Sequence, residues 1–165
     1  MLLLLSGLPG TGKSTFAEKM ASERGHAHYD LERPAQWPRP SLHALWERDR
    51  AAFARAVADA HPVGVVLDWG FPPSCRSWVE ELRTAGFTLV WFSAGEDDAR
   101  RSFLGRSPSD LTFFEAQASQ IRESGFPGRL NALEVDALGS TGHRSWTSIL
   151  ERIEENAQPR GHAKA

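Results

Sequence analysis

The chain has a single cysteine, Cys75, among its 165 residues, so no disulfide can form within it. Because proteins without internal disulfides fit a reducing compartment, we expect a cytoplasmic protein. The sequence also lacks an apolar segment long enough to cross a membrane. Its apolar start, residues 1–5, has no basic residues before it and is too short for a signal peptide, so we interpret it as a buried strand.

A marked excess of either charge is missing as well. With 19 Lys and Arg against 21 Asp and Glu, the formal net charge is −2. No basic field is therefore available to hold a long nucleic acid, although a short single-stranded end remains an option. The six histidines lack the paired spacings of a metal cage, and no obligate protein partner is evident.

The length and the absence of repeats, low-complexity tracts and linkers indicate one domain. At 165 residues the chain can bury a single good core, and 41% hydrophobic with 24% charged residues is ordinary for a globular protein. We expect residues 1–157 to form this domain. Residues 158–165 are polar and contain Pro159 and Gly161, so we expect a flexible tail there.

A phosphate-binding motif stands near the start of the chain. Residues 7–15 have the sequence GLPGTGKST, which matches GxxxxGK[ST] between a strand-like run and an amphipathic stretch. The closely spaced Gly7, Gly10 and Gly12 let backbone N–H groups turn toward phosphate oxygens, where a Cβ would obstruct them. A helix starting near Lys13 would also point its positive end at the anion. The motif predicts binding of a nucleoside triphosphate.

Each side chain of this motif has an expected role. Lys13 reaches the β- and γ-phosphates and acts in catalysis, the Ser14 hydroxyl binds Mg²⁺, and Thr15 helps to hold the α-phosphate. Pro9 and Thr11 complete the nucleotide-binding loop. We expect ATP rather than GTP, because the sequence has no NKxD-like tetrapeptide to read guanine.

Short apolar runs alternate with longer helical stretches, which is typical of βαβ units around a parallel sheet. Together with the motif, this predicts a three-layer α/β fold of the P-loop NTPase type, with a central five-stranded parallel sheet and a helical lid. The expected strands are residues 1–6, 25–29, 63–68, 87–93 and 132–135. The expected helices are residues 13–24, 41–60, 74–85, 96–104, 111–123 and 144–156.

One carboxylate ends a buried strand at residues 63–68. Because the carboxyl ends of parallel strands gather at the ligand crevice, we expect Asp68 near Ser14, where it would bind Mg²⁺ or the acceptor hydroxyl. A turn-forming aspartate is the alternative. Trp69 and Phe71 follow, either to stack on the acceptor or to pack in the core.

Another carboxylate, Asp30, ends the second expected strand. Phosphoryl transfer needs a group that orients or accepts the proton of the attacking hydroxyl, and we predict that Asp30 is this base. Arg33 could bind an acceptor phosphate or the transferring group through its planar fork. Glu32 competes with Asp30 for the same role, and a solvated polar loop is the alternative to both.

Three arginines, Arg100, Arg101 and Arg106, surround the end of a short helix. On a segment that closes over the nucleotide, arginines neutralise the charge on the transferring group and exclude water. We predict catalytic roles for Arg101 and Arg106. Each arginine taken alone fits an exposed surface position equally well.

These elements together resemble the small P-loop kinases of the polynucleotide-kinase and zeta-toxin-like group, which includes gluconate-kinase-like and chloramphenicol-phosphotransferase-like enzymes. The resemblance covers residues 1–150 and rests on GLPGTGKST, on DLER at 30–33, and on LDWGF at 67–71 followed by Arg76. The segment from Arg101 through EAQ at 115–117 resembles the lid and following helix of bacterial ATP-binding proteins in the group.

The resemblance implies a base role for Asp30 and acceptor-side roles for Arg33 and Asp68. It further implies lid roles for Arg101 and Arg106 and an adenine-side loop at residues 136–141. We also expect Trp69 and Arg76 to bind the acceptor. Two departures matter. Arg101 and Arg106 are five residues apart, where polynucleotide kinases tend to have four. Trp69-Gly70 replaces the usual small polar residues, which speaks against a nucleic-acid acceptor.

The resulting hypothesis is an ATP- and Mg²⁺-dependent kinase that phosphorylates a hydroxyl group of a small molecule or of a polynucleotide 5′ end. The alternative is a nucleotide-dependent ATPase or switch protein, which would need a water-positioning residue and an arginine from a partner.

Overall fold

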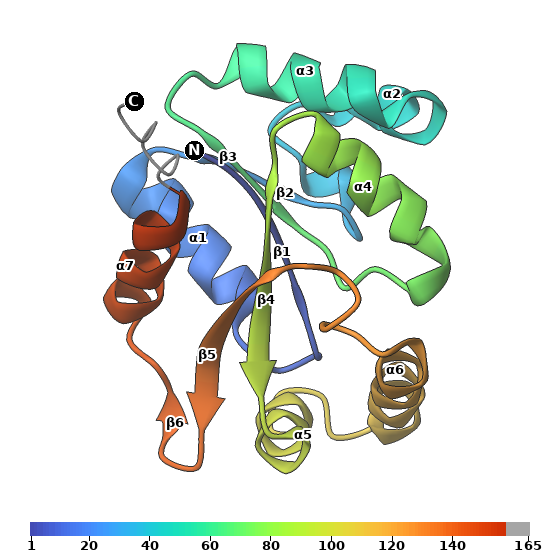
Figure 1. The fold of residues 1–165 in the computed structure, drawn as a ribbon, viewed down its shortest axis with the longest axis vertical. Helices are drawn as coiled ribbons and strands as arrows, with labels where there is room; N and C mark the ends of the chain where they lie inside the picture. Colours follow the sequence, from blue (N-terminus) through green and yellow to red (C-terminus); the bar gives the residue numbers. More distant parts are fainter. Residues whose placement is uncertain (158–165) are drawn as a thin grey trace, which may run out of the picture.

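A computed structural model describes residues 1–157, and the tail expected at 158–165 lies outside the described residues. The chain alternates strands and helices around one sheet with the order β2-β3-β1-β4-β5-β6 (Figure 1). The strands are β1 (Leu2–Gly7), β2 (Ala27–Asp30), β3 (Val65–Asp68), β4 (Thr88–Ala94), β5 (Leu133–Gly139) and β6 (Gly142–His143).

Among residues 1–157 the sheet is mixed and has six strands, which corrects the prediction of five parallel strands. The neighbours from β2 to β5 all pair in parallel, but β6 runs antiparallel to β5 through Leu138 opposite His143 and Gly139 opposite Gly142. Strand β5 is also longer than the expected 132–135, since it runs to Gly139 before the turn. A two-residue strand shows no periodicity, so the sequence pattern could not indicate β6.

In the part of the chain that the structure describes, seven α-helices connect and cover the strands. They are α1 (Lys13–Arg24), α2 (His43–Arg48), α3 (Arg50–Ala60), α4 (Arg76–Thr84), α5 (Glu96–Leu104), α6 (Leu111–Ser124) and α7 (Trp146–Ala157). The single helix expected at 41–60 is two helices. The backbone of Asp49 is extended, with φ −152° and ψ 94°, and its carboxylate accepts a hydrogen bond from the Ala52 N–H at 2.8 Å. Asp49 therefore ends α2 and caps α3.

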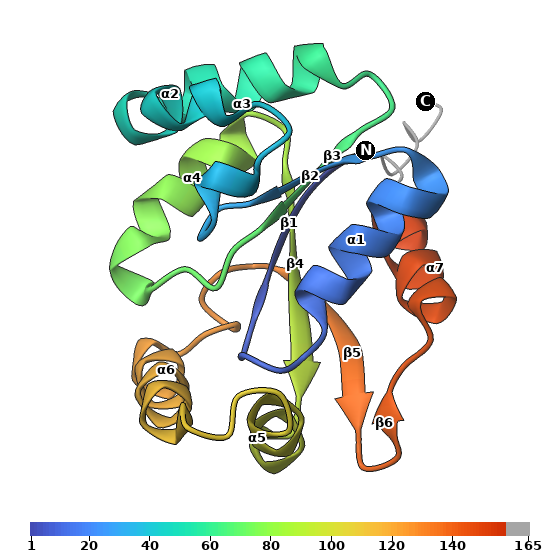
Figure 2. The same cartoon turned by 180° about the vertical axis from the view of Figure 1, so that it is seen from behind.

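Two apolar layers enclose the sheet. On one face, Leu3 and Leu5 of β1 pack with Phe16 of α1 and Ile153 of α7. Alternate residues of the same strand point the other way, where Leu4 joins a large cluster that includes α3 and α4. The two views in Figures 1 and 2 show α1 and α7 on one side of the sheet and α2, α3 and α4 on the other. Residues alternate in this way because successive strand side chains face opposite sides.

Helix α5 lies beyond the carboxyl end of β4, and α6 lies beside α5 at the bottom of Figure 1. They pack on each other through Ala99, Phe114 and Ala118, with Leu8 of the loop after β1 against this cluster. A helical lid is expected from the sequence in this part of the chain, so α5 and α6 are called the lid helices below; their closure over the nucleotide stays a prediction.

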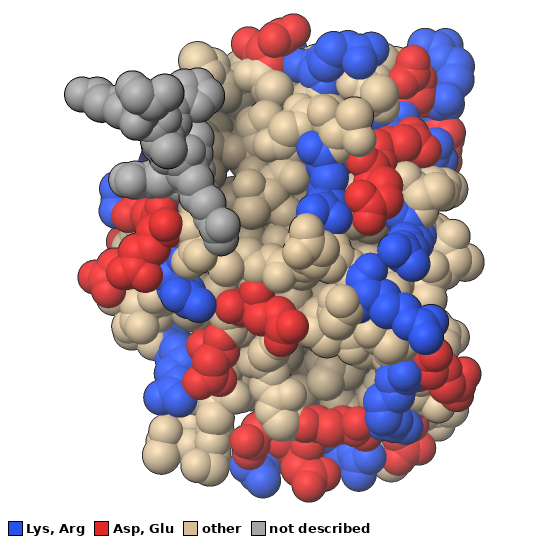
Figure 3. Space-filling view, viewed as in Figure 1, with Lys and Arg blue, Asp and Glu red and all other residues tan. Residues whose placement is uncertain are grey.

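Acidic and basic side chains are interspersed over the face shown in Figure 3. Among residues 1–157, none of the helices combines the length and the apolar character needed to span a membrane.

Candidate active site

The loop between β1 and α1 has backbone conformations that require glycine. Gly10 and Gly12 have φ of 88° and 89°, in the left-handed region that other residues avoid. A Cβ on Gly10 would also lie 2.4 Å from the carbonyl oxygen of Ala99 in α5. The loop therefore turns tightly and lies directly against the lid helix.

The Lys13 side chain folds back over this loop. Its Nζ donates hydrogen bonds to the carbonyl oxygens of Gly7 at 3.1 Å and Leu8 at 2.9 Å, and the Thr11 hydroxyl donates to the same Leu8 carbonyl at 2.9 Å. Burial lowers the pKa of Lys13, while the carboxylates of Asp68 and Glu32 oppose this shift. The ammonium thus lies at the centre of the loop with negative charge nearby.

Sheet register brings two carboxylates to one place. Asp30 of β2 pairs with Asp68 of β3, and Asp68 in turn lies opposite Leu5 of β1, just before the loop. Asp68 is buried, with 4% of its surface exposed. Burial raises its pKa, and Lys13 and the Ser14 hydroxyl act in the opposite direction. Asp68 thus lies near Ser14, as expected, and it also lies near the Lys13 ammonium.

The loop after β2 adds two more charged groups. The Asp30 Oδ1 accepts a hydrogen bond from the Glu32 N–H at 2.9 Å, and Oδ2 lies 3.6 Å from the Arg33 Nε. The Glu32 Oε1 accepts the Gly70 N–H at 3.1 Å, which ties this loop to the one after β3. Partial burial raises the pKa of Glu32, and the negative charges of Asp30 and Asp68 raise this pKa further. The hydrogen bond from the Gly70 N–H lowers it.

These groups line one cavity of about 240 Å³. Its walls come from the phosphate loop, the ends of β2 and β3, and the lid helices with the segment between them. The lining residues are Gly7, Pro9, Gly10, Lys13, Ser14, Asp30, Glu32, Arg33, Asp68, Gly70, Phe103, Arg106, Ser107, Phe113 and Gln117. Most residues singled out from the sequence thus meet in one space, although they come from segments up to about a hundred positions apart.

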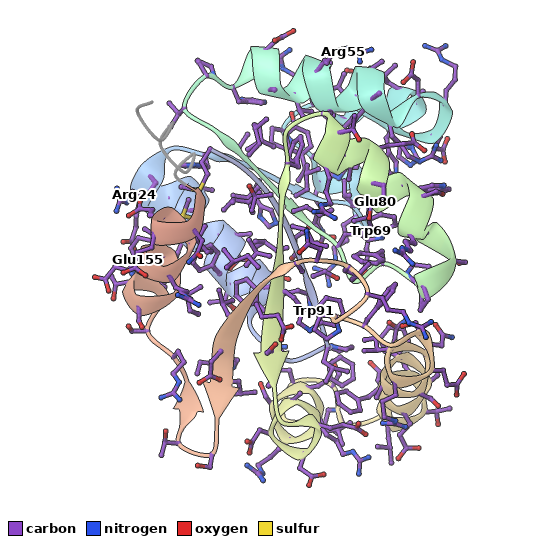
Figure 4. All side chains as sticks on the ribbon, viewed as in Figure 1. Arg24, Arg55, Trp69, Glu80, Trp91 and Glu155 are labelled. Atoms are coloured by element: carbon purple, nitrogen blue, oxygen red, sulfur yellow. The ribbon has the colours of Figure 1, made fainter. Side chains whose placement is uncertain are left out.

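Three of the residues predicted for catalysis or for acceptor binding lie elsewhere. The Arg101 guanidinium pairs with Asp98 at 3.0 Å, with 70% of its side chain exposed. The Arg76 guanidinium donates to the Arg129 carbonyl at 3.1 Å. Trp69 is buried beside α4, where its ring stacks on Trp78 with 5.9 Å between ring centroids (Figure 4). None of the three lines the cavity.

A second cavity of about 250 Å³ lies on the other side of the phosphate loop. It is lined by Thr11, Gly12, Thr15, Phe16, Lys19, Ala137, His143, Arg144, Trp146 and Ile149. The segment 136–141, expected on the adenine side, forms the end of β5 and the turn into β6 next to this cavity.

A chain of hydrogen bonds that the sequence did not indicate joins α5 and β6 to the phosphate loop. The Ser102 hydroxyl of α5 donates to the Gly10 carbonyl at 2.8 Å and lies 3.2 Å from the His143 Nε2 of β6. Sequence reasoning missed Ser102 and His143, as well as Phe103 and Phe113 on the cavity wall. Each is a single residue without a motif, so only its position in the fold reveals it. Gln117, also on the wall, entered the sequence analysis only within the EAQ segment of the lid resemblance.

The donor set near Ser14 has the chemistry of a magnesium site. No group of three or more His, Cys, Asp or Glu side chains within the described part of the chain is arranged to hold a metal ion. Mg²⁺ keeps several waters and binds through one or two carboxylates plus substrate phosphates, so it needs no such group. The buried Asp68 carboxylate beside the Ser14 hydroxyl fits this mode of Mg²⁺ coordination.

Comparison with solved structures gives the fold a counterpart. A sugar kinase from a Janibacter species matches with a TM-score of 0.59 and 18% identity, over 93% of this chain and 92% of that one. Shikimate kinase from Acinetobacter baumannii, solved with shikimate, matches with 0.58 and 14%, over 96% and 95%. A gluconokinase from Sinorhizobium meliloti matches with 0.54 and 18%, over 94% and 90%.

No family model matches the sequence, and a comparison with curated proteins finds no match. At identities of 14 to 18%, the structural likeness establishes the fold alone, which this chain shares with small-molecule kinases over almost its whole length. The gluconate-kinase-like part of the expected resemblance thus has a structural counterpart. The narrower polynucleotide-kinase and zeta-toxin-like group stays a prediction.

Proposed function

We propose that this protein is an ATP- and Mg²⁺-dependent phosphotransferase that moves the γ-phosphate of ATP to a hydroxyl group of a small acceptor. The observation that carries the proposal is a single cavity in which the phosphate loop, with Lys13, faces the carboxylates of Asp30 and Asp68. The fold shared with sugar, shikimate and gluconate kinases supports it.

The residues divide the reaction between them. The loop amides and Lys13 hold the triphosphate, and Lys13 exchanges its bonds to the Gly7 and Leu8 carbonyls for phosphate oxygens. Asp30 accepts the proton of the acceptor hydroxyl while the hydroxyl oxygen forms a bond to the γ-phosphorus. The bond between the γ-phosphorus and the β–γ bridging oxygen breaks at the same time, and ADP leaves. Arg106, on the lid side of the cavity, neutralises charge on the transferring group.

Ser14 and Asp68 are the residues that would hold Mg²⁺. When bound, the ion supplies charge neutralisation and orientation for the phosphates. Of the three carboxylates on the cavity wall, only Asp68 is buried beside the Ser14 hydroxyl. This leaves Asp30 and Glu32 for the acceptor.

The nucleotide base has a suitable place beyond the loop. The second cavity opens next to Gly12 and Thr15 and is lined by the apolar side chains of Phe16, Trp146 and Ile149. We propose that adenine binds on this side. The phosphates would then cross the loop toward Lys13, with the transferred group in the first cavity.

The direct test is transfer of ³²P from γ-labelled ATP with Mg²⁺ to a panel of small hydroxyl compounds and to a 5′-hydroxyl oligonucleotide. We expect label on a small compound and none with Lys13→Ala. Label on the oligonucleotide would establish a polynucleotide acceptor instead. Release of free phosphate with every acceptor unlabelled would favour the ATPase or switch protein, and full activity of Lys13→Ala would refute the phosphate-loop assignment.

A further inference from the structure

The acceptor end of the first cavity has a composition of its own. Lys13, Ser14 and Asp68 are assigned to phosphates and metal, and Arg106 to the transferring group. Apart from the phosphate loop, what remains on the wall is Asp30, Glu32, Arg33 and Gly70 from the strand ends, and Phe103, Ser107, Phe113 and Gln117 from the lid side. These groups decide which acceptor fits.

Size sets the first limit. About 240 Å³ must hold both the transferred phosphoryl group and the reacting part of the acceptor. Sites for drug-sized ligands measure roughly 300–1,000 Å³. The acceptor is therefore compact at its reacting end.

An aromatic pair sets the second limit on the acceptor. Phe103 and Phe113 lie with ring centroids 6.1 Å apart and an interplanar angle of 32°. Phe113 is 52% exposed although it is a large apolar residue, and it lines the cavity. An exposed aromatic ring that shares a cavity wall with carboxylates suits a ligand with one apolar C–H face and polar groups around its edge.

The charges on the cavity wall set the third limit on the acceptor. Within residues 1–157 the cavity wall carries three cations, Lys13, Arg33 and Arg106, and three carboxylates. Arg33 is the one at the acceptor end, and it lies 3.6 Å from the Asp30 carboxylate. The Glu32 Oε1 accepts the Gly70 N–H, which leaves its other oxygen and its charge for a ligand. An anionic group on the acceptor would face Asp30 and Glu32, a like-charge contact that disfavours binding.

We infer that the acceptor is a compact polyhydroxylated molecule carrying an ammonium group, of the amino-sugar class, with the ammonium on Glu32 and the reacting hydroxyl on Asp30. This inference rests on the proposed function. In the reaction the ammonium group keeps its protons, and only the hydroxyl proton passes to Asp30 as the new P–O bond forms. Glu32 is then the residue that determines specificity.

Three ligands of one ring but different charge test the inference. Glucosamine, glucose and glucuronate carry about +1, 0 and −1 at neutral pH. With the wild-type protein and MgATP, we expect kcat/KM for ADP release to be roughly tenfold higher for glucosamine than for glucose, because a charge-assisted hydrogen bond is worth that much. We expect glucuronate to be the poorest of the three. Glucuronate as the best acceptor would overturn the inference.

The variant Glu32→Gln isolates the charge, because the amide oxygen still accepts the Gly70 N–H. We expect its KM for glucosamine to rise roughly tenfold while its KM for glucose stays the same. The matched control is Glu155→Gln, at an exposed position on α7 whose carboxylate lies 4.0 Å from Arg152; it should change neither. A lower kcat with both sugars would make Glu32 the base and overturn its assigned role.

Binding of MgATP, measured as a shift in melting temperature, distinguishes failure of the amino-sugar inference from failure of the proposed function. If MgATP stabilises the wild-type protein but not Lys13→Ala, and none of the three sugars accelerates ADP release, the amino-sugar inference fails while the nucleotide site stands. If MgATP stabilises neither protein, the proposed function itself fails.

Discussion

At the scale of single residues, Asp30 is the group on which the proposed chemistry depends. We expect Asp30→Asn to lower kcat roughly 10²- to 10⁴-fold, the usual contribution of a general base, while ATP affinity stays nearly the same, because the base acts on the acceptor. Steady-state transfer and calorimetric ATP binding measure the two quantities. An equal loss of ATP affinity would show that Asp30 belongs to the metal site.

A second residue-scale feature concerns stability. The Tyr29 hydroxyl lies 2.9 Å from the His61 Nε2, which ties β2 to the end of α3. Burial lowers the pKa of His61 below 6.5, and Arg39 adds to the shift. A histidine with a lowered native pKa stays neutral while the unfolded chain takes up a proton. The stability that depends on neutral His61 is therefore complete above pH 6.5 and is lost as pH falls through the native pKa.

We therefore expect the melting temperature of the wild-type protein to fall more steeply between pH 7.5 and 5.5 than that of His61→Gln. Burial also lowers the pKa of His26, so some slope should remain in the variant. Thermal unfolding at a series of pH values measures both curves. Parallel curves would mean that the native and unfolded pKa values of His61 are the same.

The residues nearest the proposed chemistry were the easiest to place from the sequence. The motif places Lys13 and Ser14 by covalent sequence alone, and Asp30 and Asp68 follow from the rule that carboxyl ends of parallel strands meet. Trp69 shows the limit. It directly follows Asp68, but its side chain packs among Trp46, Phe71 and Trp78. The side on which a residue beyond a strand end packs depends on helices far away in the sequence.

At the scale of elements, the lid separates its two arginines. Arg106 follows α5 and lines the cavity, whereas Arg101 on α5 pairs with Asp98 away from it. We expect Arg106→Ala to lower kcat at least tenfold, because a buried charge on the transferring group would lose its partner. Arg101→Ala is the matched control, with turnover within about twofold of wild type. The reverse order would mean that the lid rearranges when nucleotide binds.

Helix and strand boundaries show which local signals suffice. The predicted helices at 13–24 and 96–104 match α1 and α5 in full, because glycine and the acidic first turn mark their ends. The break at Asp49 escaped prediction, since Asp inside a polar helical stretch also fits a solvent-exposed position. Its capping hydrogen bond to Ala52 depends on the extended backbone that the fold imposes there.

At the scale of the whole molecule, the residues of the aromatic core and the residues that line the two cavities lie in different parts of the structure. The aromatic cluster with Trp46, Trp69 and Trp78 packs on the face covered by α2 to α4. Both cavities lie at the loop end, on either side of the phosphate loop. The α/β class and the place of the site followed from the sequence, but the cavity wall did not. Phe113 and Gln117 of α6 line the same cavity as Glu32, so this wall is assembled from segments that lie far apart in the sequence.

This separation predicts opposite effects for two aromatic residues. Trp69 is 7% exposed and Phe113 is 52% exposed. Truncation of a buried Trp costs about 3–5 kcal/mol, so Trp69→Ala should lower the free energy of unfolding by that amount in urea titrations. Phe113→Ala should cost well under about 1 kcal/mol, as exposed positions usually do.

The kinetic effects should be reversed. Phe113→Ala should raise the KM of the acceptor several-fold, because the ring lines the cavity. Trp69→Phe, a milder change that keeps the core filled, should leave that KM unchanged. If Trp69→Phe raised the acceptor KM at unchanged stability, Trp69 would belong to the acceptor site as the sequence first suggested. The sheet would then not divide the molecule into a stabilising face and a reactive end.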